Sequence, residues 1–600
     1  MIFKPIILAL AGGMILSCSQ KGEKLALPSI NDGYVNAKYS GAQTSVQGTW
    51  GALNCHDPKL FQDDDGTYYV YSTDASIGDF GVKGLQIRKS TDLVHWTCLS
   101  DSAIQGNWDK EWTEWVGFTK SGKEPTSWAP TVIKQNGLYY MMHGIITENI
   151  MSSKPSAAIT LAVASKPEGP FYPAATAAQN DSKILDTFNS LGIKYESSFI
   201  VRYSFYEYLH EEFKGANAKK CLNNGMYNGQ TGEEEDFAGW LYGFGCIDPE
   251  FVTDVATGNL VEFDKNGRKC YALTYGSWKG GIALIYVDSL LLKPVDSNGN
   301  VIDFSCDTER GCFGKAIAGG YGAAYEGAQL IFNSDIESYY LFVSMGNLEH
   351  EYRVGVGRSA SVDGPFYDAS GRPMLLDGMN SMQYHSIGSK IKGATQIGKE
   401  KPFRCPGGQS ILRASDGNVY FACHTRTNFL PGYFFYLQIN QLFFNKDGWP
   451  VLNVNEYYPL EKRSGPFEMS QVAGEYDVIL TERGNKTGKF SGFGYAFPAD
   501  EINLIDAEPT VSKKININSK GKISGAFKGF IELGEFDERG FQNVKVTLKG
   551  KNYNGGKAVF TGVLTLGLDW TLESEEKSPE LTFSCLDSSE SGEYFMGNRR

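Results

Sequence analysis

The segment Leu60–Thr73 reads LFQDDDGTYYVYST. An apolar strand, a turn built on Asp and Gly, and a Tyr-rich strand follow one another, which is the pattern of a β-hairpin. Four later segments repeat it, namely Val132–His143 (VIKQNGLYYMMH), Phe251–Ser277 with a longer turn, Leu330–Ser344 and Ile411–Thr425. The feature that decides the fold is therefore a hairpin that recurs five times along the chain.

The hairpins follow a long period, which one tyrosine in each of them marks. These are Tyr68, Tyr139, Tyr271, Tyr339 and Tyr420, at separations of 71, 132, 68 and 81 residues. An insertion of about 60 residues within the stretch 173–245 accounts for the wide gap. Five units of about 70 residues, each with room for four strands, predict a five-bladed β-propeller. The alternative, a β-sandwich, would show turn signals every 8–12 residues without this period.

The repeat ends after Trp449-Pro450, and strand-like segments continue in a Gly- and Lys-rich region. We therefore expect an all-β chain of two domains. A five-bladed propeller would occupy residues 46–458, and a smaller antiparallel β-barrel or sandwich would occupy residues 462–600. The composition of the 600 residues, with 42% apolar and 21% charged side chains, is ordinary for globular domains.

The charge balance limits the choice of partner. Asp and Glu number 69 against 56 Lys and Arg, which gives a formal net charge of −13 without a basic block. Nucleic-acid binding depends on neutralising phosphates, so we expect no nucleic-acid partner. A neutral polymer fits this charge better than a polyanionic one.

The N-terminus predicts export. Lys4 precedes the apolar run Ile6–Leu16, whose 11 residues are too few to span a bilayer. The next residues, Ile15–Cys18 (ILSC), resemble a bacterial lipobox, in which the Cys is lipidated. We predict a lipoprotein signal peptide over residues 1–17, a lipid on Cys18 that holds the protein at the outer membrane or cell surface, and a polar tether over residues 18–45. An ordinary secretory signal is the alternative.

Ten further cysteines are scattered over the chain without the spacing of a zinc site. Cys306 and Cys312 are close enough for a small loop disulfide. The sequence leaves the pairing open.

Acidic residues recur where the hairpins begin. Asp57 lies 11 residues before Tyr68, Asp248 begins the third hairpin, and Glu326 lies 13 residues before Tyr339. The first strands of propeller blades line the axis, so these acids should converge there. Burying several carboxyls together is costly, and the cost points to function. Turn capping beside Pro or Gly, the alternative, explains Asp57 or Asp248 singly but hardly three acids in phase.

Carboxyl groups facing one another across a pocket are the equipment of glycoside hydrolysis. One must be ionised to deprotonate water, while another must stay protonated to donate to the departing oxygen, which requires a raised pKa. A third acid can tune that pKa.

Segments around these acids resemble glycoside hydrolase family 43, and within it the bacterial α-1,5-L-arabinanases that carry a C-terminal β-barrel domain. The resemblance runs from about residue 46 to 600 and rests on segments that include His56-Asp57-Pro58, Trp128-Ala129-Pro130, Ile247-Asp248-Pro249, Glu326-Gly327, YGSWKGGI (Tyr275–Ile282), CHTR (Cys423–Arg426) and FFNKDGWPV (Phe443–Val451). It implies that Asp57 is the general base, Glu326 the general acid and Asp248 the residue that tunes and orients the acid. It also implies inversion of configuration, for which the two carboxyls should lie roughly 6.5–9.5 Å apart.

Three further residues are candidates for contacts to the sugar, namely Trp128, Ser277 and Trp278. Packing between blades is the alternative for both tryptophans. The stretch Asn107–Trp115 holds three Trp in nine residues, and exposed indoles there would stack on sugar rings.

The fifth hairpin departs from the family pattern. The resemblance implies Pro-Gly-His-Asn on its first strand, with the His contacting a central metal, typically calcium. This chain has Pro406-Gly407-Gly408-Gln409 instead, so Gly408 replaces the usual ligand. Water, a cation held through Gln409, or another loop would then fill the centre. His424 matches a different family position, where we expect a hydrogen-bonded packing residue.

The sequence thus predicts an anchored endo-arabinanase that cleaves α-1,5-linked arabinan, a neutral plant cell-wall polysaccharide. An exo-acting arabinofuranosidase or β-xylosidase is the alternative within the same chemistry, because the family that the chain resembles spans those substrates. The insertion before Asp248, with its GEEEDF run (232–237), would favour end cutting if it walled off the cleft, and a solvated face is the alternative for that run. A non-catalytic glycan-binding lipoprotein is the alternative from another class.

Overall fold

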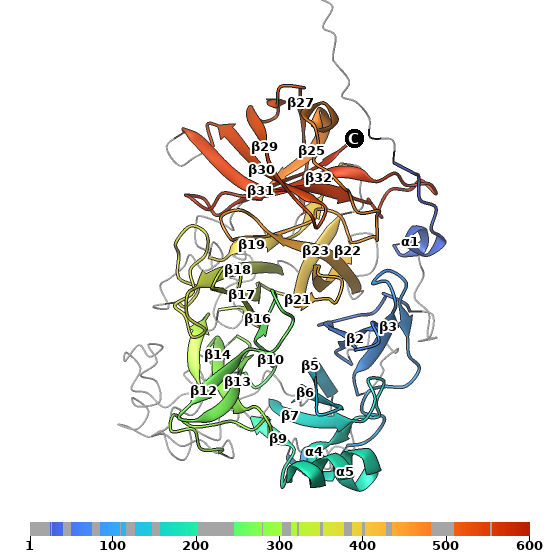
Figure 1. Ribbon diagram of the computed structural model, residues 1–600, viewed down its shortest axis with the longest axis vertical. Helices are drawn as coiled ribbons and strands as arrows, with labels where there is room; N and C mark the ends of the chain where they lie inside the picture. Colours follow the sequence, from blue (N-terminus) through green and yellow to red (C-terminus); the bar gives the residue numbers. More distant parts are fainter. Residues whose placement is uncertain are drawn as a thin grey trace, which may run out of the picture.

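The computed structural model describes residues 25, 27–39, 50–74, 84–108, 110–115, 126–146, 157–201, 245–278, 280–302, 314–320, 323–348, 352–376, 387–398, 402–427, 435–481, 509–551 and 555–600. Five β-sheets surround a common centre, and a closed β-barrel lies beside them (Figure 1). The predicted signal peptide, Cys18, the acidic run 232–237, and both Cys306 and Cys312 lie outside the described residues, whereas residues 173–201 of the stretch that carries the predicted insertion are described.

The first three sheets are blades 1 to 3 of a propeller. Blade 1 comprises β1 (Lys59–Gln62), β2 (Tyr68–Ser72), β3 (Gln86–Ser90) and β4 (Thr97–Cys98). Blade 2 comprises β5 (Thr126–Gln135), β6 (Leu138–Ile146), β7 (Ala157–Ala164), β8 (Tyr172–Pro173) and β9 (Phe199–Val201), with helices α4 (Ala174–Asn180) and α5 (Ser182–Leu191) after β8. Blade 3 comprises β10 (Glu250–Phe251), β12 (Glu262–Lys265), β13 (Arg268–Tyr275), β14 (Ile282–Asp288) and β15 (Lys315–Ala318).

The remaining sheets complete the ring and form the second domain. Blade 4 comprises β11 (Thr253–Asp254), β16 (Tyr325–Asn333), β17 (Ser338–Met345), β18 (Arg353–Ser359) and β19 (Ser389–Lys392). Blade 5 comprises β20 (Thr395–Gln396), β21 (Phe403–Arg413), β22 (Val419–Thr427), β23 (Tyr436–Phe444), β24 (Pro450–Leu452) and β26 (Thr510–Val511). The barrel closes through β25 (Gly474–Leu480), β27 (Lys513–Ile517), β28 (Lys522–Gly525), β29 (Gly529–Asp537), β30 (Phe541–Lys549), β31 (Lys557–Gly567), β32 (Glu580–Leu586) and β33 (Tyr594–Arg599).

The predicted fold class, an all-β propeller followed by an antiparallel barrel, is confirmed. Each of the five predicted hairpins forms an antiparallel pair of strands, namely β1–β2, β5–β6, β10–β13, β16–β17 and β21–β22. Strands in the middle of a blade are buried on both faces because a neighbouring blade packs on each side. All nine residues of β6 (LYYMMHGII) and all eight of β7 are buried, so these strands read as continuous apolar runs rather than alternating ones.

The barrel has a filled interior. Tyr476, Phe560, Phe583 and Phe595 pack together in its core with aliphatic side chains from the other strands. Closure pairs every strand with two neighbours, which removes the exposed edges that an open sheet of this size would have.

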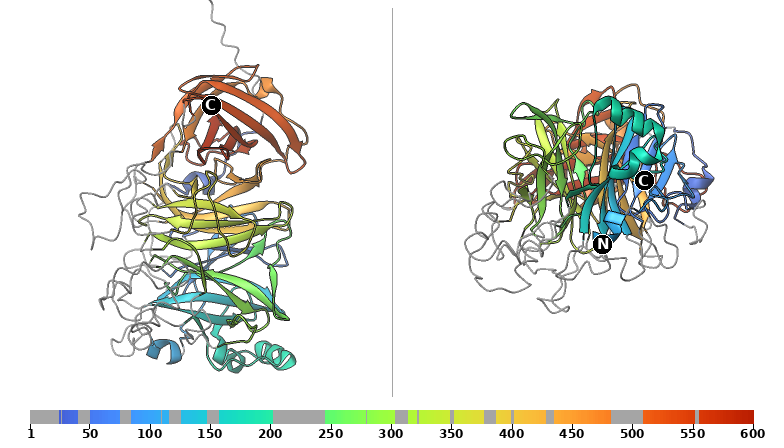
Figure 2. Two further views of the ribbon diagram at one scale, coloured as in Figure 1. Left: turned by 90° about the vertical axis from the view of Figure 1, so that its left-hand side faces the viewer. Right: turned by 90° about the horizontal axis from the view of Figure 1, so that it is seen from below.

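The barrel packs against the rim of the propeller beside blades 4 and 5, so that the two domains lie end to end along the molecule (Figure 2). The rings of Phe443 on β23 and Phe541 on β30 lie 4.9 Å apart. The Asn445 side chain donates to the backbone carbonyl of Thr561 at 2.9 Å. A mixed apolar and polar contact therefore joins the domains away from the propeller axis.

The segment 27–39 was predicted to be part of a tether, but it packs against both domains. It contains helix α1 (Gly33–Ala37), whose N-cap Asp32 also pairs with His95 of blade 1 at 2.9 Å. Lys38 donates to the Leu437 carbonyl of blade 5 at 2.6 Å, and Ile30 forms a backbone bridge with Lys577 after β31. Burial of the Val35 and Tyr39 side chains explains the docking. The tether prediction rested on the polar composition of the segment, which did not reveal these two apolar anchors.

A buried ion pair fixes this segment. Lys38 donates to Glu456, and the two side chains are only 3% and 7% exposed. Tyr39 donates to the other oxygen of Glu456 at 2.7 Å. Burial lowers the pKa of Lys38, and Glu456 opposes that shift.

We expect Lys38→Met to lower the free energy of unfolding by about 3–5 kcal/mol, because it leaves Glu456 buried without its cation. The double variant K38M/E456Q removes both charges and should recover most of the loss. Urea denaturation followed by tryptophan fluorescence measures both. A double variant no more stable than K38M alone would contradict the view that the unpaired charge causes the loss.

Candidate active site

Five residues with left-handed backbone, one from each blade, form a ring around the propeller axis. They are Asp57, Ala129, Asp248, Gly327 and Gly408, with φ between 41° and 58°. All five line one cavity of about 40 Å³. A left-handed conformation costs a non-glycine residue about 1–2 kcal/mol, and strain of this kind gathers at functional sites.

The ring corrects the alignment that the tyrosine spacing predicted. Trp128, Glu326 and Gly407 pair with equivalent residues of the next strand, and an irregularity in each first strand follows directly. Each ring residue comes one position later. The tyrosine spacing placed Glu326 in phase with Asp57, which is wrong by one residue because the hairpin turns differ in length. Tyr68 pairs with Gln62 and Tyr339 pairs with Phe332, and the ring residue lies five positions before the paired residue in both hairpins.

Asp57 is held as a carboxylate. His56 Nδ1 lies 2.6 Å from Asp57 Oδ2, and Thr73 Oγ1 donates to the same oxygen at 2.8 Å. Burial opposes ionisation, but His56 and Thr73 outweigh it and lower the pKa of Asp57 to about 2. At neutral pH this carboxyl is ionised and able to accept a proton.

Glu326, in contrast to Asp57, tends to retain its proton. Burial raises the pKa of its carboxyl, and the nearby charge of Asp57 raises it further. Ser277 Oγ donates to Oε2 at 2.7 Å and Tyr352 Oη donates to Oε1 at 2.9 Å, and both contacts oppose the shift. Because the Ser277 and Tyr352 hydroxyls donate to the carboxyl oxygens, neither accepts the carboxyl proton of Glu326. That proton stays available for donation.

Asp248 interacts electrostatically with both of these acids. Its Oδ2 accepts the backbone N–H of Gly327 at 2.9 Å, which ties it to the residue after Glu326. Burial, Glu326 and Asp57 together hold the pKa of Asp248 well above its ordinary value. The axis therefore carries one carboxyl that is ionised and two that retain protons more readily, which suits general base and general acid chemistry.

Comparison with known proteins agrees with this arrangement. The family described as "Glycosyl hydrolases family 43" matches residues 51–191 and 263–450, more than half of the chain. The chain belongs to glycoside hydrolase family 43. Asp57 and Glu326 fall within the matched segments, and Asp248 falls between them. A family described as "C-terminal lipocalin-like domain" matches residues 454–597, which contain the barrel.

Curated relatives and solved structures of this family cover most of the chain. An extracellular endo-alpha-(1->5)-L-arabinanase of Thermotoga petrophila is 26% identical over 499 residues, 80% of this chain and 83% of the relative. The extracellular endo-alpha-(1->5)-L-arabinanase 2 of Bacillus subtilis is also 26% identical, over 91% of this chain and 93% of its own length. The crystal structure of an endo-1,5-alpha-L-arabinanase from Thermotoga petrophila has a TM-score of 0.62 at 22% identity, covering 92% of this chain and 99% of that one, which shows the shared fold.

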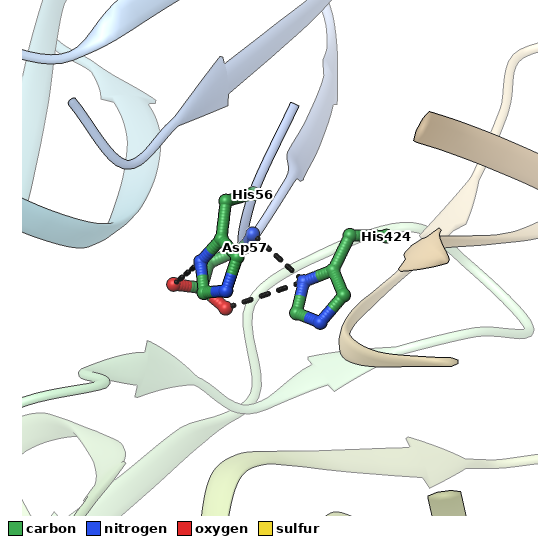
Figure 3. A group of neighbouring side chains, drawn as sticks. All are labelled: His56, Asp57 and His424. Atoms are coloured by element: carbon green, nitrogen blue, oxygen red, sulfur yellow. Dashed lines mark hydrogen bonds and ion pairs between the residues drawn. The ribbon is translucent and has the colours of Figure 1, made fainter. Parts of the chain in front are cut away.

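The residues at the centre of this family 43 site do not fit the calcium ion that the resemblance implied. Gly408 offers no side chain. Among the described residues, His56, Asp57 and His424 form a group whose possible ligand atoms lie within 4.8 Å of one another (Figure 3). Calcium prefers oxygen ligands, whereas two of these three are imidazoles. The rings are stacked, with centroids 4.2 Å apart and planes 17° from parallel, so their in-plane lone pairs do not point at one ion. His424 Nδ1 already accepts the backbone N–H of Asp57 at 3.1 Å.

Gln409, the other suggested cation ligand, is already engaged by the protein. Its Oε1 accepts the Ser344 hydroxyl at 2.8 Å, and its amide nitrogen donates to the carbonyls of Gly327 and Phe342. Gln409 therefore braces blades 4 and 5, and its amide oxygen is held by the Ser344 hydroxyl.

The predicted sugar contacts lie near the acids in different surroundings. Trp128 is partly exposed and packs on the core between blades 2 and 3. Ser277 and Trp278 are 9% and 8% exposed, and the Ser277 hydroxyl is bound to Glu326. Of the three Trp in the stretch Asn107–Trp115, Trp112 is fully buried against His143, so it is not available for stacking on a sugar.

The sequence did not reveal three residues that contact the acids. Thr73 and His424 bind Asp57, and Tyr352 binds Glu326. Thr73 directly follows β2 and contacts Asp57 across the same hairpin. His424 lies on β22 and contacts Asp57 from the neighbouring blade. A search for polar residues opposite each candidate acid would have found Thr73. The position of Tyr352 just before β18 carried no such signal.

We expect Gly408→Ala to reduce glycoside hydrolysis at least about 10²-fold, because a Cβ there would lie 2.4 Å from Asp57 Oδ1 and misplacements of about 1 Å cost that much. Gly66→Ala is the matched control, since Gly66 also has a positive φ but has no atom within 4 Å of the added Cβ. Rates on linear arabinan, with circular dichroism to verify folding, decide the matter. A folded G408A enzyme as fast as G66A would show that the crowding is harmless.

Proposed function

We propose that this family 43 hydrolase cleaves α-1,5-linked L-arabinan within the chain, with inversion at the anomeric carbon. The observation that carries the proposal is the pairing of an ionised Asp57 with a Glu326 whose pKa is raised by burial and by the nearby charge of Asp57. This is the division of labour that glycoside hydrolysis requires. The names of the relatives at 26% identity support arabinan as the substrate.

In the proposed reaction, Asp57 takes a proton from water as the water attacks the anomeric carbon. Glu326 gives its proton to the departing glycosidic oxygen, and the bond between that oxygen and the sugar breaks. Asp248 orients the acid through the Gly327 N–H and shares its protonation equilibrium. Inversion further predicts that the carboxyls of Asp57 and Glu326 lie roughly 6.5–9.5 Å apart.

For substrate contacts we propose Trp128 as an aromatic surface for a sugar ring, with Ser277 and Trp278 on the acid's side of the cavity. The partial exposure of Trp128 next to the ring residue Ala129 supports its assignment. Contacts from Ser277 would be shared with Glu326, which it already holds.

We further propose that the protein is exported and held at the outer membrane or cell surface by a lipid on Cys18. Two relatives are named extracellular, which supports export. Within the described part of the chain, none of the helices has the length and apolarity that crossing a membrane requires. Mass spectrometry of the membrane fraction from the native host tests the lipid.

The product profile on linear arabinan tests the function. Mixed oligosaccharides early in the reaction, with NMR showing an inverted anomer first, are the expected result. Arabinose alone would replace the proposal with an exo-acting enzyme, and release only from xylosides would indicate a β-xylosidase. Binding of arabinan without release of any product would leave the non-catalytic glycan-binding protein.

We expect Glu326→Ala to slow arabinan hydrolysis about 10²–10⁴-fold and to remove the alkaline limb of the pH profile of kcat/KM. The acid works while protonated, so wild-type activity should persist above the ordinary pKa of a glutamate and decline as the pH rises through the raised pKa of Glu326. Glu262→Ala, which removes an exposed glutamate of blade 3, is the control and should change neither quantity. An E326A enzyme that retains the alkaline limb would refute the acid assignment.

A further inference from the structure

Three aromatic side chains from three neighbouring blades form a stack of nearly parallel rings. The rings of His56 and His424 are stacked with centroids 4.2 Å apart. On the blade 4 side, the rings of His424 and Tyr352 lie 5.7 Å apart and within 3° of parallel. His56 precedes β1, His424 lies on β22, and Tyr352 precedes β18, so only the closed ring of blades brings them together.

Each end of this stack holds one of the two reacting carboxyls. His56 Nδ1 contacts Asp57 Oδ2 at 2.6 Å, and Tyr352 Oη donates to Glu326 Oε1 at 2.9 Å. The general base and the general acid are therefore joined through side-chain rings rather than through a direct contact.

The middle ring holds the backbone of the base. His424 Nδ1 accepts the Asp57 N–H at 3.1 Å, at a residue whose φ is 48°. Burial and His56 hold the pKa of His424 well below its ordinary value, so the ring is neutral and its Nδ1 lone pair is available as an acceptor. For the same reason the 3.5 Å approach of Nδ1 to Asp57 Oδ1 is not an ion pair.

The stack fits because two consecutive glycines leave room for it. A Cβ on Gly407 would lie 2.0 Å from the Tyr352 ring, and a Cβ on Gly408 would lie 2.9 Å from His424 Nδ1. Both are far inside normal contact distance. The glycine that departs from the family pattern and the stacked rings therefore belong to one arrangement.

We propose that the His56–His424–Tyr352 stack is the spacer that sets the separation and orientation of the two reacting carboxyls, with His424 and Tyr352 as positioning residues. The proposal rests on the function proposed above. Packed rings resist compression, and the reaction is sensitive to displacements of about 1 Å. His424 acts through Asp57, and Tyr352 acts through Glu326.

The two ends of the stack should respond differently to the leaving group. A dinitrophenoxide leaves without protonation, whereas a sugar alkoxide needs the proton of Glu326. Tyr352→Leu should therefore slow hydrolysis of arabinan at least about 10-fold more than hydrolysis of a dinitrophenyl arabinobioside. His424→Leu disturbs the base, which both substrates need, and should slow the two equally. A merely structural defect at Tyr352 would not separate the substrates.

Conservative variants separate positioning from folding. Tyr352→Phe keeps the ring without the hydroxyl, and His424→Asn places an amide oxygen near the position of Nδ1. Both should retain more kcat than the leucine variants, with KM within about twofold of wild type and equal melting temperatures within each pair.

The outcomes are distinct. A wild type that hydrolyses neither substrate overturns the proposed function and this inference with it. An active wild type whose folded Y352L and H424L variants keep normal kcat, or whose Y352L variant slows both substrates alike, overturns the spacer alone.

Discussion

The site depends on an absence of side-chain volume at the propeller axis. Asp57 Oδ1 lies 2.4 Å from the position that a Cβ on Gly408 would occupy, and Tyr352 lies still closer to the corresponding position of Gly407. Any larger residue there would push the base or the rings outward. Five left-handed residues, one from each blade, line this restricted space. The geometry of the acids is therefore set by backbone conformation and packing before any charge is considered.

Charge then distinguishes acids that share the same burial. Asp57 receives an imidazole N–H and a hydroxyl, which stabilise its ionised form enough to overcome desolvation. Glu326 receives two hydroxyls, which do not overcome burial and the charge of Asp57. Asp248 accepts the backbone N–H of Gly327, and burial with the charges of Glu326 and Asp57 holds its pKa well above its ordinary value. The number and kind of donors around each carboxyl thus decide which group is ready to accept a proton and which is ready to give one.

The sequence predicted what depends on local pattern and missed what depends on closing the ring. Each hairpin carries its own turn and strand signals, so five blades and a following barrel were visible without coordinates. The one-residue error at Glu326 arose because the hairpin turns differ in length. The paired residues Phe332 and Tyr339 are one residue further apart in the chain than Gln62 and Tyr68, so counting back from the tyrosine does not fix the equivalent position. The role of His424 was missed because its partner, Asp57, is 367 residues away in the chain. The sequence predicted an exposed Trp112 because its neighbours are polar, and only the folded structure shows the core in which its indole is buried.

The packed N-terminal segment has a consequence for how the protein is made. Ile30 precedes the propeller in the chain, yet its backbone partner is Lys577, and Lys38 of the same segment binds the carbonyl of Leu437. The segment that contacts both blade 1 and blade 5 therefore cannot dock fully until blade 5 and the region around Lys577 have been synthesised. A chain that ends early keeps an open seam where a protease can enter, so completion of synthesis and resistance to degradation are linked by the same strip of backbone.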